Sequence, residues 1–116
     1  MSGKSSQRKG AAGEAELRDL FRAEGYDVER GGYCFGQRPD ILGLPGVHIE
    51  CKRVEKLNLH HAMQQAAADA ERFQDGFPAV FHRRNREGWL VTMSLEGWKT
   101  LYRAFWRDFV GDDGRC

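Results

Sequence analysis

The 116-residue chain lacks the features that mark several large classes of protein. No apolar run approaches the about 20 residues that a helix needs to cross a bilayer, so a membrane-spanning protein is not expected. The first ten residues, MSGKSSQRKG, lack the apolar core of a secretory signal peptide, which favours a cytoplasmic protein. Internal repeats are also absent, and the length fits one domain.

Cysteine is scarce, and Cys34, Cys51 and Cys116 show no paired spacing. An odd number of unpaired cysteines is typical of reduced thiols in a cytosolic protein rather than of a disulfide scaffold. The three cysteines and four histidines also lack the C-x₂₋₄-C and H-x₃₋₅-H spacings of structural zinc sites. The sequence therefore disfavours a zinc module, and Cys51 is expected to pack inward as a small apolar side chain.

The net charge is only +1, so the overall charge does not indicate a polyanionic partner. The basic residues are nevertheless clustered, in an acid-free stretch at positions 1–9 and in the run HRRNR at positions 82–86. Such patches can contact phosphates, although a solvated tail and an exposed hairpin tip explain them equally well. The candidate DNA contacts are Lys9, Arg38, His82, Arg83, Arg84 and Arg86.

Hydrophobic periodicity predicts one α/β domain over residues 10–110, between a disordered basic leader at 1–9 and a frayed tail at 111–116. Helices are expected from Gly10 to Gly25, over 59–73 with Asn58 as the N-cap, and after a cap at Ser94. Gly76 and Pro78 should end the second helix. Strands are expected at 26–30, 40–44, 47–54, 78–84 and 89–94.

This order, α-β-β-β-α-β-β-α, predicts a central mixed β-sheet flanked by helices. The last helix carries an apolar stripe that is expected to join the core, formed by Trp98, Leu101, Tyr102 and Phe105. Trp106 and Phe109 widen this stripe beyond what one helix face needs. A dimer contact through this helix is therefore a second interpretation.

The strand over 47–54 carries the residues of greatest chemical interest. Val47, Ile49 and Cys51 alternate with His48, Glu50 and Lys52, so Glu50 and Lys52 share one face. An exposed strand with an intrastrand ion pair is the ordinary explanation of such a pattern. His48 lies on the same face, where a surface histidine is the simplest expectation, with a contact to the site or to substrate as the alternative.

Asp40 changes the interpretation of this strand. The turn at Pro45-Gly46 allows the strand that begins near Asp40 to lie beside the strand that contains Glu50. Two carboxylates brought that close repel each other unless a cation lies between them, and Mg²⁺ is suited to such oxygen ligands. The sequence therefore predicts a divalent-metal site at Asp40 and Glu50, with Lys52 placed to stabilise charge on a phosphate.

Glu14 is a third candidate acid. It lies three residues before Leu17 and seven before Phe21, which puts it at the edge of the apolar stripe of the first helix. It can therefore face the predicted site. A favourable charge near the N-terminus of the helix explains it equally well.

The segments KGAAGEAEL, RPDILG and HIECKR, in this order and spacing, resemble the PD-(D/E)XK nuclease superfamily, and within it the archaeal-type Holliday junction resolvases. The later segments QQAAADAERF and AVFHRRNREGWLVTM are similar to small endonucleases of phages and prophages, which would place the protein in a bacterial host cytoplasm. The matches cover residues 9–94. The resemblance implies a restriction-endonuclease-like domain and a homodimer that cuts four-way DNA junctions.

By this resemblance, Asp40 and Glu50 bind Mg²⁺ together with the backbone carbonyl of Cys51, and Mn²⁺ can substitute. Glu14 joins through a water molecule, and Lys52 acts at the attacking water. A glutamine of the following helix supports the site; Gln65 is preferred to Gln64 because it lies nearer the centre of the helix stripe. One departure is that residues 26–40 contain no Ser or Thr, whereas the resolvases carry a Ser before Arg-Pro-Asp.

The sequence thus predicts a Mg²⁺-dependent endodeoxyribonuclease that hydrolyses DNA phosphodiesters, with Holliday junctions or other branched DNA as substrates. The alternative is a non-catalytic nucleic-acid-binding or assembly module that has a nuclease-like fold and contacts DNA through its basic turn and tail. A plain interaction domain without a DNA role is the third hypothesis.

Overall fold

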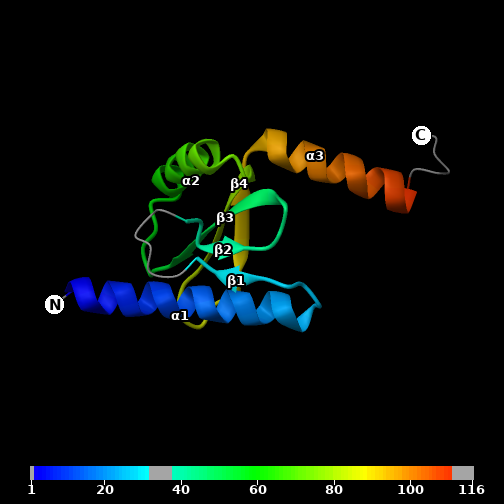
Figure 1. The fold of residues 1–116 in the computed structure, drawn as a ribbon. Coiled ribbons are helices and arrows are strands. Elements are labelled where there is room, and N and C mark those ends of the chain that lie inside the picture. Colours follow the sequence, from blue (N-terminus) through cyan, green and yellow to red (C-terminus); the bar gives the residue numbers. More distant parts are fainter. Residues whose placement is uncertain (1, 32–37, 111–116) are drawn as a thin grey trace.

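The computed structural model describes residues 2–31 and 38–110, with residues 2–9 described as backbone only. Three helices and a five-stranded sheet form a single α/β domain, as predicted (Figure 1). No helix in the described ranges combines the length and the apolar character needed to cross a membrane. The elements are α1 (Ser2–Ala23), β1 (Glu29–Arg30), β2 (Ile41–Leu42), β3 (Gly46–Arg53), α2 (Leu59–Phe73), β4 (Gly76–Arg83), β5 (Leu90–Met93), α3 (Leu95–Phe105) and the π-helical segment η1 (Trp106–Val110).

The sheet is mixed, with the strands in the order β1-β2-β3-β4-β5. β3 and β4 are parallel and are paired from Gly46↔Gly76 to Arg53↔Arg83, whereas the other neighbours are antiparallel. The crossover between the parallel strands is α2, as the geometry of a parallel pair requires. β3 and β4 are therefore the centre of the sheet.

Helices cover the two faces of β3 with different side chains. Toward α1, Ile49 and Cys51 pack with Leu17 in the main apolar cluster. A Cβ atom at Gly13 would lie 2.9 Å from the Cβ atom of Arg53, so the glycine lets α1 approach the strand closely. Toward α2, a smaller cluster contains Ala62, Ala66 and Val80. Because side chains alternate along a strand, Glu50 and Lys52 lie on the α2 face.

Several element boundaries differ from the sequence predictions. α1 begins at Ser2 and includes most of the segment expected to be a disordered leader, where Lys, Gln and Arg are good helix formers. β1 and β2 have two residues each. α2 ends at Gln74, which adopts a left-handed conformation with φ 53°, so Gly76 and Pro78 belong to β4 rather than to the end of the helix. The tail at 111–116 lies outside the described residues.

The prediction that the stripe of α3 joins the core is wrong. Trp98, Leu101, Tyr102 and Phe105 are 43–51% exposed, and Phe109 is 78% exposed. α3 leads away from the rest of the domain toward the C-terminus (Figure 1). α1 and α2 pack on the two faces of β3, where the buried apolar clusters of the described residues lie, and the stripe of α3 is not part of either cluster. The aromatic rings stack on one another instead, with centroids 5.0–5.7 Å apart.

Candidate active site

Asp40 is fixed at the point where β2 begins. In the antiparallel pair, Ile41 is opposite Ile49, so Asp40 comes opposite Glu50 one step further along. The backbone N–H of Cys51 donates to Oδ2 of Asp40 at 2.8 Å, and the N–H of Gly31 donates to the Asp40 carbonyl at 2.9 Å. Pro39, the next residue back, has no N–H with which to continue the ladder. The carboxylate thus takes over part of the strand pairing.

Three carboxylates, those of Asp40, Glu14 and Glu50, lie close together where β2 begins beside β3. Burial raises the pKa of Asp40 to about 7, and the negative charges of Glu50 and Glu14 add to this effect. Burial also raises the pKa of Glu14, although Arg30, 3.3 Å away, opposes the shift. Glu14 therefore faces Asp40 and Glu50, which is one of the two interpretations that the sequence left open. An excess of buried negative charge is gathered here.

Glu50 lies next to a buried histidine. Nε2 of His48 is 3.2 Å from Oε1 of Glu50, and Nδ1 of His48 is 2.9 Å from the carboxylate of Asp75. Burial alone would lower the pKa of His48, but the hydrogen bonds to Glu50 and Asp75 raise it above its ordinary value. Its ring is wholly buried and stacks on Phe73, so the expectation of a surface histidine is wrong. His48 instead links Glu50 to the start of β4.

Lys52 lies beside the helix that crosses over between β3 and β4. Its Nζ atom donates to Oε1 of Gln65 at 3.2 Å. Both Gln64 and Gln65 are exposed, but Gln65 is the one that contacts the strand, as its position on the helix favoured. The amide fixes the direction of a long side chain that would otherwise be free to rotate.

Asp69 is a possible ligand that the sequence interpretation missed. His48, Glu50 and Asp69 each offer one ligand atom, and these atoms lie within 4.8 Å of one another. Asp69 is one helical turn after Gln65, so the two side chains share a face of α2. The four-residue spacing from Gln65 to Asp69 could have indicated that Asp69 also faces the site. It does so only once α2 is known to cover Glu50. Glu50 belongs to this group as well as to the predicted pair with Asp40.

Two predictions concern Cys51: its side chain packs inward, and its backbone carbonyl binds the metal ion. Its side chain is buried against α1, as expected, and burial raises the pKa of the thiol, so it is no activated thiolate. That its backbone carbonyl binds a metal ion remains a prediction.

The predicted DNA contacts differ in how they are placed. Arg83 makes a two-pronged ion pair with Glu16, from Nε at 3.0 Å and Nη2 at 3.2 Å, and lies over the ring of Trp89, so it connects β4 to α1. His82 is 2.9 Å from the hydroxyl of Thr92.

Other basic residues are more exposed. Arg84 pairs with Glu87 at the surface, while Arg38 and Arg86 are exposed. Lys9 belongs to α1, whose side chains are described from Gly10 onward. Tyr33, Cys34 and Gln37, which belong to the segment without Ser or Thr, lie outside the described residues.

Comparisons with known proteins agree with the fold. No family model matches the chain, and no curated protein matches it. Among solved structures, the chain is similar to Hjc, a Holliday junction resolvase from the archaeal hyperthermophile Archaeoglobus fulgidus, with 23% sequence identity and a TM-score of 0.55. The match covers 73% of this chain and 72% of the archaeal one. The resemblance to archaeal-type resolvases is confirmed at the level of the fold.

Proposed function

We propose that this chain is a divalent-metal-dependent endodeoxyribonuclease. The observation that carries the proposal is the convergence of Asp40, Glu50 and Glu14 where β2 begins beside β3, with Lys52 two residues from Glu50 on the same face. The shared fold with a Holliday junction resolvase supports it. A buried carboxyl group whose pKa is strongly raised by burial and by nearby carboxylates is a candidate functional residue.

The donor set fits a hard divalent ion. Asp40 and Glu50 offer carboxylate oxygens, and burial first, then the negative charge of Glu50, raises the pKa of Asp40 to about 7, so a bound cation would favour the ionised form. We infer that these two residues hold Mg²⁺ or Mn²⁺, with the Cys51 carbonyl and, through water, Glu14. When bound, the ion supplies charge neutralisation at the phosphate and lowers the pKa of an attacking water.

The chain's own residues would position and stabilise the reacting groups. Lys52, held by Gln65, presents an ammonium group that can orient the attacking water or stabilise the negative charge that develops on the phosphate. His48, anchored by Asp75, holds Glu50 in place at the centre of the sheet. Gln65 and Asp75 lie outside β3, so the site depends on how α2 and the start of β4 pack against this strand.

We propose branched DNA as the substrate, with the Holliday junction as the leading example, because Hjc is described as a Holliday junction resolvase. We also propose a cytoplasmic location. Arg38, Arg84 and Arg86 are exposed and remain the candidate phosphate contacts among the described residues. Arg83 is the exception, since Glu16 already binds its guanidinium group.

We further propose that the active form is a homodimer, in which α3 packs against α3 of a second copy in antiparallel orientation. The exposed apolar side chains of α3 and η1 would bury roughly 600 Å² per copy, close to what a stable interface needs. Charge also fits this arrangement, because Glu96 near the start of α3 would meet Arg103 or Arg107 near its end in the partner.

The direct test is a panel of labelled branched and linear DNAs incubated with Mg²⁺, Mn²⁺ or EDTA. We expect metal-dependent nicking by the wild-type protein, lost in both Asp40→Asn and Lys52→Ala, while both variants still bind DNA in Ca²⁺. Undiminished cleavage by the two variants would rule out this site. Binding without any product from the wild-type protein would indicate a non-catalytic DNA-binding module instead.

A further inference from the structure

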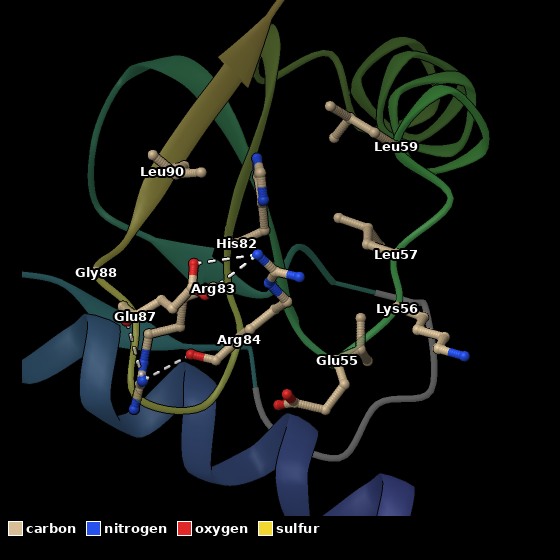
Figure 2. Close-up of a pocket in the computed structure, with 11 residues that line it drawn as sticks. Glu55, Lys56, Leu57, Leu59, His82, Arg83, Arg84, Glu87, Gly88 and Leu90 are labelled. Carbon is tan, nitrogen blue, oxygen red and sulfur yellow. Dashed lines mark hydrogen bonds and ion pairs between the residues drawn. The ribbon is translucent and has the colours of Figure 1, made fainter.

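A groove of about 360 Å³ lies beyond the ends of β3 and β4 and beside the start of β5. Leu57 and Leu59 lie on one side of it and Leu90 on the other, with His82 between them (Figure 2). None of these four residues is needed for the metal site. The groove is therefore a separate feature of the surface.

The groove continues the face that carries the candidate active site. Lys52 is paired with His82 in the parallel register, so both side chains point toward the α2 side of the sheet. Val54 and Arg84, which line the groove, are two residues beyond them, or about 6–7 Å further along the strands. A DNA strand whose phosphate lies at Lys52 would thus bring a neighbouring nucleotide to the groove.

The walls of the groove suit a flat apolar group. Leu90 is 61% exposed although it faces Leu57 and Leu59 across the groove, so apolar surface is open to solvent there. Burial lowers the pKa of His82, which keeps its ring neutral near pH 7. Flipped nucleobases bind between apolar or aromatic side chains in the same way.

The other end of the groove is charged. Glu55 and Lys56 lie there, and the side chain of Arg84 extends from that end toward His82 (Figure 2). The acids have contacts of their own, since Glu55 accepts from the backbone N–H of Asn85 at 2.8 Å and Glu87 pairs with Arg84. The Arg84–Glu87 pair is exposed on both sides, so a phosphate group can displace it at little cost.

We infer that this groove binds one unpaired nucleotide next to the cleaved phosphodiester, with its base between Leu90 and the Leu57/Leu59 wall and its phosphate toward Lys56 and Arg84. The volume is near the lower end for small-ligand sites, which admits one base but no base pair. The inference rests on the proposed function and deepens it, because it makes an unpaired nucleotide, at a flap, a single-strand end or an opened junction, the recognised feature of the branched substrate.

The test uses DNA that carries 2-aminopurine at single positions along a branched substrate, bound in Ca²⁺ without cleavage. We expect the fluorescence to change at one unpaired position and Leu90→Ser to remove that change. The same variant should bind branched DNA about fivefold to tenfold more weakly, but paired duplex less than twofold more weakly. Leu20→Ser, at a leucine of α1 with 49% exposure, is the matched control and should leave both unchanged.

The outcomes separate this inference from the proposed hydrolysis. Metal-dependent cleavage without any position-specific fluorescence change would refute nucleotide binding in the groove but would leave the proposed nuclease activity supported. A position-specific fluorescence change without cleavage by the wild-type protein would support nucleotide binding in the groove but would refute the proposed nuclease activity. Equal weakening of branched and duplex binding by Leu90→Ser would also overturn the inference.

Discussion

The side chain of Asp40 accepts a hydrogen bond from the backbone N–H of Cys51 at 2.8 Å, across the gap where β2 begins beside β3. A carboxylate therefore performs a structural task that a backbone carbonyl performs elsewhere in the sheet. The same carboxylate is held close to Glu50 and Glu14, which raise its pKa further. The hydrogen bond from Cys51 thus stabilises the fold through Asp40, whereas burial and the charges of Glu50 and Glu14 disfavour the ionised form of the same residue.

We expect Asp40→Asn to stabilise the metal-free protein at and above about pH 7. The amide oxygen can still accept from Cys51, and the negative charge is removed. The pKa of Asp40 is raised from 3.8 to about 7 by burial and by Glu50, so the wild-type fold loses stability as the pH rises through this window. The gain in Tm should be about 5 °C or more above pH 7 and should vanish toward pH 4. An unchanged or lowered Tm above pH 7 would mean that the carboxylates do not repel one another.

Gln65 and Gln64 provide a matched pair of adjacent residues. Only Gln65 is hydrogen-bonded to Lys52 among the contacts of the described chain, so Gln65→Ala should slow cleavage about tenfold by leaving the ammonium group unrestrained. Gln64→Ala should change the rate less than twofold. Single-turnover cleavage at saturating protein measures the effect apart from DNA affinity. Equal effects of the two substitutions would show that the Lys52–Gln65 contact does not matter.

His48 is expected to be a stabilising residue as well as a support for Glu50. His48→Gln cannot satisfy Glu50 and Asp75 together, so it should lower the free energy of unfolding by about 3 kcal/mol. His60→Gln, at an exposed histidine of α2, should have an effect below about 0.5 kcal/mol. Urea denaturation at neutral pH measures both. A small effect of His48→Gln would show that the buried network contributes little.

Asp40 and Asp69 allow the two possible sets of metal ligands to be compared. Glu50 belongs to both, but Asp40 lies on β2 and Asp69 lies on α2 beside His48. We expect Mn²⁺ to raise the Tm of the wild-type protein, because an ion that binds only the folded state stabilises it. Asp69→Asn should retain most of this shift, whereas Asp40→Asn should abolish it. The reverse result would assign the ion to His48, Glu50 and Asp69.

Local signals in the sequence were sufficient for the central elements. The alternation along 47–54 and the Asn58 cap predicted β3 and α2 within a residue, since both elements are long and strongly periodic. β1 and β2 were predicted too long, because the backbone at Gly43 turns to φ 117° directly after β2. Short strands are set by such turns and by their neighbours rather than by propensity.

Only part of the candidate active site could be predicted from the sequence. The pairing of Asp40 with Glu50 followed from the strand order and the intervening turn. The contact between His48 and Asp75 spans 27 residues and depends on how β4 returns beside β3, which no local pattern encodes. The prediction that the apolar stripe of α3 joins the core was wrong for a related reason. Periodicity shows that a helix face is apolar but not which surface covers it.

That uncovered stripe leads to the last prediction, on the assembly of the protein. If α3 packs against α3 of a second copy, then Trp98→Glu combined with Phe105→Glu places charges at the centre of the interface. Sedimentation equilibrium should then show two chains for the wild-type protein and one for the double variant. Leu20→Glu, at a similarly exposed apolar residue of α1, should remain dimeric. Because both substituted rings are about half exposed in the single chain, the double variant should keep its fold and its Tm within a few degrees, and a wild-type protein that sediments as one chain would refute the α3 interface.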